Sequence, residues 1–416
     1  PHVSKDFAAV RLQTKIDNAG EKTQIRIETE ILSPDGKVVT SKENTSRINH
    51  GQPFEQNFIV NAPELWSPES PSLYKAVSKI YADDKLVDTY TTRFGIRSIE
   101  YIADKGFYLN GKHRKFQGVC NHHDLGPLGA AINVAALRHQ LTLLKDMGCD
   151  AIRTSHNMPT PELVALCDEM GFMMMIEPFD EWDIAKCENG YHRYFNEWAE
   201  RDMVNMLHNY RNNPCVIMWS IGNEVLEQWS DAKADTLSLE EANLILNFGH
   251  SSEMLAKEGE ESVNSLLTKK LVSFVKGLDP ARPITAGCNE PNSGNHLFRS
   301  GVLDVIGYNY HNKDIPNVPA NFPDKPFIIT ESNSALMTRG YYRMPSDRMF
   351  IWPERWDKSF ADSTFACSSY ENCHVPWGNT HEESLKLVRD NDFISGQYVW
   401  TGFDYIGEPT PYGWPA

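Results

Sequence analysis

From residue 104 onward, short apolar runs alternate with amphipathic stretches of helical period, and this alternation repeats eight times. Short continuous apolar runs are typical of strands that are buried on both faces. The stretches between them, such as 135–148 and 160–171, end on a glycine, which is a common stop signal for a helix. Eight units of a strand followed by a helix predict a (β/α)8 TIM barrel. The eight runs are 116–120, 151–156, 172–179, 216–224, 283–288, 305–311, 326–332 and 396–404.

Residues 1–103 follow a different rhythm, because polar and apolar residues alternate over short segments separated by turn signals such as "SPDG" and "YADDK". Short strands at this spacing predict an all-β sandwich. We therefore divide the chain into a sandwich domain, 1–103, and a TIM-barrel catalytic domain, 104–416. The sequence stops just beyond the eighth run, so we expect the barrel to lack its last helix.

Two insertions interrupt the barrel pattern. Residues 227–270 are acidic and helical in character, and residues 339–381 are rich in aromatic residues and serine. Long connections in a compact fold are usually functional loops. We expect both insertions on the catalytic rim of the barrel.

The composition narrows the class of partner. The 416 residues carry a net charge of −16, whereas nucleic acids and anionic membranes attract basic surfaces. No apolar stretch approaches the roughly 18 residues of a membrane-spanning helix. These features disfavour nucleic acid and membrane as partners and permit a neutral ligand, while a homo-oligomer stays open.

The eight cysteines are scattered singly, without a CxxC pair or the spacing of a metal site. This pattern disfavours a zinc or redox centre. Most of the cysteines lie in apolar runs and are interpreted as buried free thiols. Cys367 and Cys373, in a polar segment, form the one pair considered for a disulfide.

Polar and aromatic residues gather where the apolar runs end. In a TIM barrel these ends converge on one face, and active sites lie on that face. Residues far apart in the sequence are therefore expected to share one site. The residues concerned are His122, His123, Arg153, His156, Glu177, Asp180, Glu181, Asp183, Asn223, Glu224, Tyr308, Tyr310, Glu331, Trp400 and Asp404.

Several of these residues also have a purely structural interpretation. His156 could be a hydrogen-bonded core histidine, and Arg153 could be the ion-pair partner of an acidic neighbour such as Glu177. Trp400 could simply pack at the rim. The joint pattern is harder to explain without a ligand, because burying so many polar groups is costly.

Two glutamates are candidates for a catalytic pair. Glu224 ends the fourth run and Glu331 ends the seventh. Paired carboxylates are what cleavage of a glycosidic bond needs, because one protonates the departing oxygen while the other attacks or supports the anomeric carbon. The abundant tryptophan and tyrosine residues offer stacking faces for sugars.

Five motifs carry a resemblance to a known family. "GVCNHHDLGP", "AIRTSHNMPTPELVALCDEMGF", "RNNPCVIMWSIGNEV", "KPFIITES" and "GQYVWTGFDY" occur in this order and resemble glycoside hydrolase family 2. That family contains β-galactosidases, β-glucuronidases and β-mannosidases. The resemblance covers essentially the whole chain and implies that 1–103 is an immunoglobulin-like domain. It also implies a fragment of a larger protein, without the family's N-terminal jelly-roll domain.

The resemblance implies roles for individual residues. Glu224 matches the acid/base and Glu331 the nucleophile of a retaining double displacement, and Asn223 matches the position that binds the sugar 2-hydroxyl. Tyr310 matches a tyrosine that hydrogen-bonds the nucleophile. Three further residues match sugar-contacting positions: His122, His156 and Trp400.

One departure concerns a metal. The best-known β-galactosidases of the family carry a Glu-x-His magnesium pair after the third strand, whereas this chain has Glu181 and Asp183 around Trp182. We therefore expect no required cofactor and keep Glu181 only as a weak metal candidate. The "PFDEWD" variant resembles β-galactosidases of Bacteroides-type bacteria, which suggests Asp180 as an acceptor for a sugar hydroxyl.

Three functions are compared on this basis. The first is an exo-acting β-galactosidase, and the second is a β-glucuronidase of the same family. A glucuronidase needs cations for the substrate carboxylate, typically from an Asn-x-Lys motif soon after the eighth strand. This chain ends just where that motif would begin, and the segment 401–416 contains neither Lys nor Arg. The third is a sugar-binding barrel without turnover, which the presence of both Glu224 and Glu331 disfavours.

Overall fold

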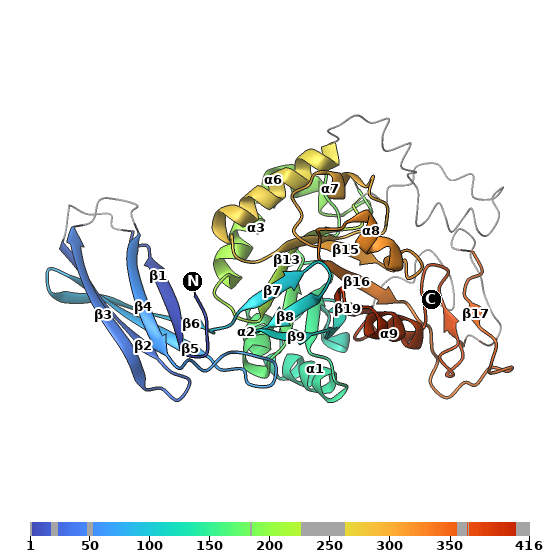
Figure 1. The fold of residues 1–416 in the computed structure, drawn as a ribbon, viewed down its shortest axis with the longest axis horizontal. Helices are drawn as coiled ribbons and strands as arrows, with labels where there is room; N and C mark the ends of the chain where they lie inside the picture. The colour runs from blue at the N-terminus through green and yellow to red at the C-terminus, as the bar shows by residue number, and fades with distance from the viewer. Residues whose placement is uncertain are drawn as a thin grey trace.

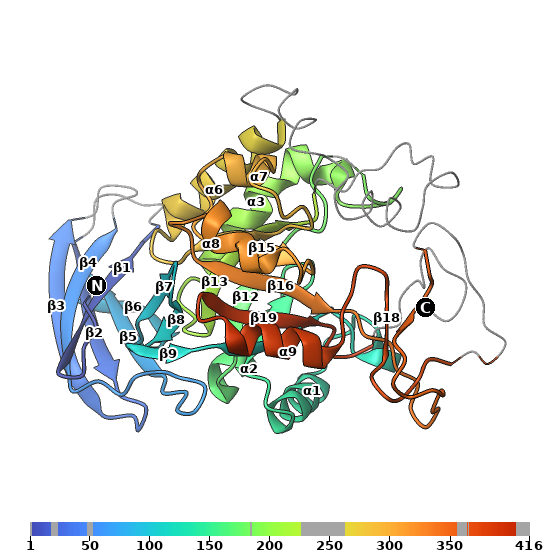
Figure 2. The same ribbon diagram turned by 45° about the vertical axis from the view of Figure 1, so that its right-hand side comes forward.

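The computed structural model of the chain describes residues 2–17, 24–47, 53–183, 185–225, 263–355, 364 and 366–404. The described residues form a β-sandwich at one end of the long axis and a larger α/β part next to it (Figures 1 and 2). The short strands β17 (Phe350–Ile351) and β18 (Cys373–His374) lie at the opposite end from the sandwich.

The α/β part is the predicted TIM barrel. Its eight strands are all parallel, and the order around the sheet is β14-β13-β12-β11-β10-β19-β16-β15. A bridge between Cys288 and Tyr308 brings the first and last of these strands together, and the Asn309 N–H donates to the Cys288 carbonyl at 2.8 Å. Each predicted run overlaps one observed strand, and β10, β16 and β19 extend one or two residues beyond their runs. These strands are β10 (Phe116–Asn121), β11 (Ala151–Thr154), β12 (Met173–Ile176), β13 (Val216–Asn223), β14 (Ile284–Gly287), β15 (Ile306–Asn309), β16 (Phe327–Asn333) and β19 (Ile394–Trp400).

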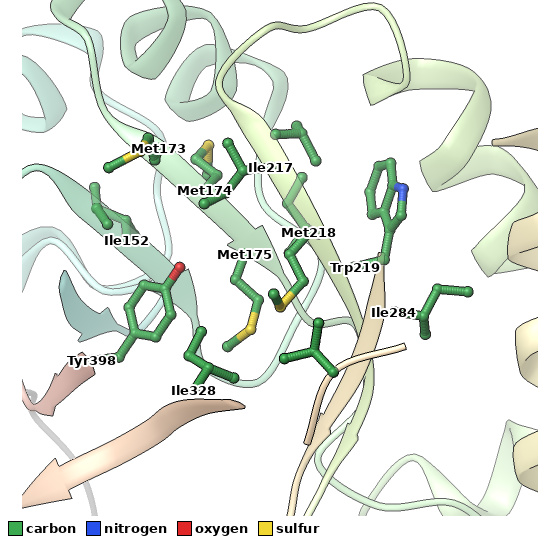
Figure 3. Close-up of a cluster of buried hydrophobic side chains, with 14 of the residues drawn as sticks. Ile152, Met173, Met174, Met175, Ile217, Met218, Trp219, Ile284, Ile328 and Tyr398 are labelled. Atoms are coloured by element: carbon green, nitrogen blue, oxygen red, sulfur yellow. The ribbon is translucent and has the colours of Figure 1, made fainter. Parts of the chain in front are cut away.

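Apolar side chains fill the barrel and the layer between its strands and helices. Met173, Met174, Met175 and Met218 are fully buried, and Figure 3 shows them in one cluster that also includes Ile217 and Trp219. Methionine suits such a core because its unbranched side chain fills irregular gaps. Full burial of one such side chain stabilises the fold by about 1.5–3 kcal/mol relative to exposure.

Two helices show clear local signals at their ends, and α2 ends at the glycine that the sequence predicts. In α2 (Pro161–Met170) the Thr160 side chain accepts the Leu163 N–H, and Gly171 ends the helix in the left-handed conformation with φ 75°. Helix α9 (His381–Asp390) opens on a capping box formed by Thr380 and Glu383. The other described helices are α1 (Val134–Asp146), α3 (His192–Tyr210), α6 (Val263–Leu278), α7 (His296–Arg299) and α8 (Val318–Asn321), with short 3₁₀ turns η1 (Gly126–Leu128) and η3 (Ile315–Asn317).

The N-terminal domain is the predicted sandwich of two antiparallel sheets. One sheet pairs β1 with β4, and the other has the order β3-β2-β5-β6. Strand β3 carries no apolar alternation in the sequence, because it pairs with β2 at the edge of the sheet and most of its residues are exposed. The strands are β1 (Phe7–Thr14), β2 (Gln24–Leu32), β3 (Val38–Arg47), β4 (Phe54–Asn61), β5 (Tyr74–Ala82) and β6 (Lys85–Phe94).

A buried contact joins the sandwich to the barrel. Trp66 is fully buried, and its indole N–H donates to the Asp168 carbonyl at 3.0 Å. Gly171 lies so close to Pro68 that a Cβ on it would stand 2.4 Å from the Pro68 carbonyl oxygen. A three-stranded sheet then leads into β10 and consists of β7 (Ile99–Ile102), β8 (Gly106–Leu109) and β9 (Lys112–Arg114).

The two predicted insertions and the end of the chain are only partly covered by the described residues. Most of the 227–270 insertion and the end of the chain after residue 404 lie outside the described residues. The 339–381 insertion is largely described and carries β17 and β18.

All eight cysteines are free thiols, including Cys367 and Cys373, and Cys187 alone among them is exposed. None of the helices in the described part of the chain combines the length and hydrophobicity needed to cross a membrane.

Candidate active site

Arg153, at the end of β11, is the centre of the polar cluster. It is fully buried, and its guanidinium binds the carboxylates of Glu177 and Glu331, each at a closest distance of 2.7 Å. It also donates to the side-chain oxygen of Asn223 at 2.8 Å and to the Thr330 carbonyl at 3.1 Å. The guanidinium thus holds side chains from strands β12, β13 and β16 in fixed positions.

Glu177 is the ionised, buried ion-pair partner of Arg153. It is fully buried, yet the charges of Arg153 and His156 lower its pKa against the effect of burial. Its oxygens accept hydrogen bonds from the Ser220 hydroxyl at 2.6 Å and from His156 Nδ1 at 2.5 Å. The structural interpretation of the Arg153–Glu177 pair is therefore confirmed, and the pair also fixes the ring of His156.

Glu331 lies on β16 with only 4% of its surface exposed. Burial raises its pKa, and Arg153 opposes this effect, while the nearby charge of Glu224 raises the pKa further. His156 Nε2 lies 3.6 Å from Glu331 Oε1. The phenol of Tyr310 accepts a hydrogen bond from the Ser334 hydroxyl at 3.0 Å, and burial together with the nearby charges of Glu331 and Glu224 raises its pKa.

Glu224 follows β13 directly and is only partly buried. Its backbone is in the left-handed region with φ 44°, and its N–H donates to the Gly287 carbonyl at 2.7 Å. One of its carboxylate oxygens accepts a hydrogen bond from the side-chain amide of Asn309 at 2.7 Å. Glu224 and Glu331 are therefore brought into one network, as the sequence predicts.

Asn223 is the link between this network and the solvent side of the site. Its side-chain oxygen accepts from Arg153 and Asn309, and its amide nitrogen donates to Asp180 Oδ1 at 3.0 Å and lies 3.2 Å from His156 Nε2. The Lys186 ammonium contacts the same Asp180 oxygen at 3.0 Å.

Asp180 is the accessible acceptor of the cluster. Its side chain is 48% exposed. Although partial burial acts in the opposite direction, Lys186 and His156 together with the hydrogen bond from Asn223 lower its pKa to about 2. Asp180 is therefore an ionised hydrogen-bond acceptor throughout the neutral pH range.

Three aromatic side chains form a wall beside Glu331. The ring of His156 stacks on Trp400 at 5.5 Å with an interplanar angle of 7°, and His122 meets Trp400 edge-on at 4.9 Å. Burial lowers the pKa of His122 to about 4, so this imidazole is neutral at neutral pH. Flat apolar faces of this kind suit the C–H surface of a sugar.

Glu181 does not fit the role of a metal ligand. It is buried, and its two oxygens accept N–H bonds from the backbone of Lys186 and from the backbone and ring of His192, at 2.7 to 2.9 Å. These bonds fold the connection between β12 and α3. Within the described ranges, no group of three or more His, Cys, Asp or Glu side chains is arranged to hold a metal ion.

We expect a chelator to change the turnover rate by less than about tenfold, because a carboxylate already saturated by N–H donors holds Mg²⁺ weakly. The measurement is the initial rate on an aryl glycoside before and after dialysis against EDTA. A hundredfold loss that Mg²⁺ restores would contradict this expectation.

The structure corrects part of the predicted cluster. Tyr308 is a core residue whose hydroxyl donates to the Pro291 carbonyl at 2.5 Å. His123 and Asp404 are exposed at the periphery. The sequence did not point to Asn309 or Lys186, which the structure places in the polar network. Of these two residues Asn309 is the more recognisable, because it stands at a strand end between Tyr308 and Tyr310.

The site therefore has the paired carboxylates of a glycosidase on the catalytic face of a TIM barrel. Residues 101–365 match the TIM barrel domain of the glycosyl hydrolases family 2, and residues 1–97 match a second domain of that family. The chain belongs to glycosyl hydrolases family 2.

Two curated relatives illustrate the range of similarity. The beta-galactosidase BoGH2A of Bacteroides ovatus is 68% identical over 100% of this chain and 49% of its own length. A putative beta-glucuronidase of Formosa agariphila is 31% identical over 98% of this chain and 36% of its own length. The chain thus spans about half, or less, of the length of these relatives.

Solved structures agree with the fold. A beta-glycosidase from Bacteroides vulgatus superimposes with a TM-score of 0.78 at 30% identity, over 98% of this chain and 49% of the other. A glycosyl hydrolase family 2 member from Bacteroides cellulosilyticus gives a TM-score of 0.73 at 29% identity, over 98% and 43%. The immunoglobulin-like sandwich followed by a TIM barrel is therefore the fold of this family.

Proposed function

We propose that the protein containing this chain is a retaining β-galactosidase that removes terminal galactosyl units by double displacement. In this proposal Glu331 is the nucleophile and Glu224 is the acid/base. The observation that carries the proposal is the difference between the partners of these two carboxyl groups within one network. Glu331 is bound by the permanent cation Arg153, whereas Glu224 is bound by the neutral amide of Asn309.

These partners suit the two roles. The guanidinium of Arg153 favours the ionised form of Glu331, which the nucleophile needs, and so opposes the rise in pKa that burial and Glu224 cause. A neutral amide can bond a carboxyl oxygen whether or not the group carries a proton, which an acid/base needs because it changes state during the cycle. The two environments separate the roles of the two groups.

The reaction then runs in two steps. Glu331 attacks the anomeric carbon and forms an ester bond, while the bond to the departing oxygen breaks and Glu224 gives that oxygen its proton. In the second step Glu224 takes a proton from water, the water oxygen bonds to the anomeric carbon, and the ester bond to Glu331 breaks. Two inversions give overall retention.

The surroundings of the two carboxylates favour a neutral sugar. Asp180 is a half-exposed, ionised acceptor for sugar hydroxyls, Asn223 lies beside it at 3.0 Å, and the wall of His122, His156 and Trp400 offers stacking surface. The galactoside assignment is supported by the 68% identity to a protein named beta-galactosidase.

A β-glucuronidase is the second candidate, because a relative at 31% identity is named as one. Recognition of a sugar carboxylate needs an available cation. The ammonium of Lys186 is already bound to Asp180 and to the Asn223 carbonyl, at 3.0 and 2.9 Å. This pairing favours the galactosidase over the glucuronidase.

The test is a panel of p-nitrophenyl β-glycosides of galactose, glucuronic acid and mannose, assayed with the protein that contains this chain. We expect kcat/KM for the galactoside to exceed that of the other two by at least about a hundredfold, because a misplaced polar group leaves site groups unpaired. Preference for the glucuronide would overturn the galactoside assignment, and no turnover of any glycoside would support a binding protein instead.

A further inference from the structure

Asn309 occupies a position that leaves its side chain little freedom. It is the last residue of β15, it is fully buried, and it lies opposite Glu331 in the β15–β16 register. Its own N–H is bonded to Cys288 across the closure of the barrel. The backbone that carries the side-chain amide is therefore fixed on both sides.

The orientation of the Asn309 amide follows from Arg153. A guanidinium has only donors, so the Asn223 atom that faces it at 2.8 Å must be the side-chain oxygen. Asn309 approaches the same Asn223 oxygen at 2.9 Å, and it can do so only with its NH₂ group. The Asn309 oxygen is correspondingly turned to the Thr330 hydroxyl, which donates to it at 2.6 Å.

The same NH₂ group reaches Glu224. Its distance to Glu224 Oε1 is 2.7 Å, so both amide hydrogens are used, one on Asn223 and one on Glu224. Gly287 packs closely against this cluster, since a Cβ on it would stand 2.6 Å from Arg153 Nη2 and 3.0 Å from Asn309 Oδ1. Glu224 Oε1 is therefore reserved as an acceptor.

On the basis of the proposed function, we propose that Asn309 is the positioning residue of the acid/base. By holding Glu224 Oε1 it places the transferable proton on Oε2. The amide bonds Oε1 in both protonation states, so it fixes the same oxygen for donation to the leaving group and for activation of water. Asn309 also ties this carboxyl group to Asn223, the residue proposed to bind the sugar.

The test compares Asn309→Ala with the unaltered protein on a lactose-like substrate and on dinitrophenyl galactoside. General acid catalysis contributes 10²–10⁴-fold, and we expect Asn309→Ala to lose a share of it, about 10- to 100-fold in kcat/KM on the lactose-like substrate. The dinitrophenyl substrate needs no protonation, so its first step should change by less than about threefold. Azide should accelerate the second step of the variant.

The matched control is Asn312→Ala. Asn312 belongs to the same connection after β15, and its amide donates to the Ser384 hydroxyl at 3.1 Å, away from both carboxylates. We expect this variant to keep the activity of the unaltered protein on both substrates.

Thr330→Val provides a second test in case Asn309→Ala does not fold. Thr330→Val removes the hydroxyl that fixes the Asn309 oxygen and keeps the shape of the side chain. It should show a smaller loss that again depends on the leaving group.

Glu224→Ala, measured in parallel, separates a failure of the proposed function from a failure of the inference about Asn309. If Glu224→Ala loses activity equally on both substrates, the proposed function itself is wrong, and the role of Asn309 is wrong with it. If Glu224→Ala shows the leaving-group dependence but neither Asn309→Ala nor Thr330→Val does, Asn309 is a structural residue and the inference alone fails.

Discussion

We expect Glu331→Gly to lose at least about 10⁴-fold in turnover of dinitrophenyl galactoside, since removing a nucleophile costs on this order or more in other enzymes. Azide should then restore release of the dinitrophenolate. The glycine leaves a space next to the anomeric carbon, and a small anion can enter it and attack in place of the carboxylate. The measurement is the rate of dinitrophenolate release with increasing azide.

The matched control for Glu331→Gly is Glu331→Gln. Glutamine fills the space of the native side chain, so this variant should be as inactive as Glu331→Gly but should not respond to azide. The fold should survive either change, because Arg153 keeps its fully buried partner Glu177. Unchanged activity of either variant would show that Glu331 is not the nucleophile.

The second large effect concerns Glu224→Ala. A sugar alkoxide is a poor leaving group, so the loss of the acid should cost about 10²–10⁴-fold in the first step on lactose-like substrates. A dinitrophenolate leaves without a proton, so the first step should barely change on dinitrophenyl galactoside. The second step lacks its base on either substrate, and the glycosyl-enzyme should accumulate.

Rapid-mixing kinetics on dinitrophenyl galactoside test this expectation through a burst of dinitrophenolate that approaches one equivalent per active site. Azide should remove the burst by accelerating the second step. Glu383→Ala is a suitable comparison, because this glutamate caps α9 and has no contact with the network around Arg153 among the described residues. Equal losses on both substrates without a burst would make Glu224 a structural residue.

Much of the fold could be predicted because the relevant signals are local. Each barrel strand is a continuous apolar run, since both of its faces are buried, and helices such as α2 carry their own caps. Strand β3 could not be predicted in the same way. Its pairing with β2 is made by backbone groups, and its exposed side chains leave no periodic pattern.

The members of the site could largely be predicted, but their connections could not. Barrel geometry brings strand ends together, which is why Glu224 and Glu331 were expected to share a site. The partners of Arg153 are 24, 70 and 178 residues away in the sequence, and only the folded barrel shows that one guanidinium meets all three. Lys186 depends on the loop that Glu181 organises, and no short-range pattern marks it.

The anomeric configuration of the two azide products tests the central claim most directly. It is read from the proton coupling at the anomeric carbon by NMR, after Glu331→Gly and Glu224→Ala have each turned over dinitrophenyl galactoside with azide. In Glu331→Gly azide attacks the substrate once from the nucleophile's side, so the product should be the α-galactosyl azide. In Glu224→Ala azide attacks the glycosyl-enzyme from the opposite side, so the product should be the β-galactosyl azide. The same configuration from both variants, or the two configurations exchanged, would contradict the assignment of Glu331 as nucleophile and Glu224 as acid/base.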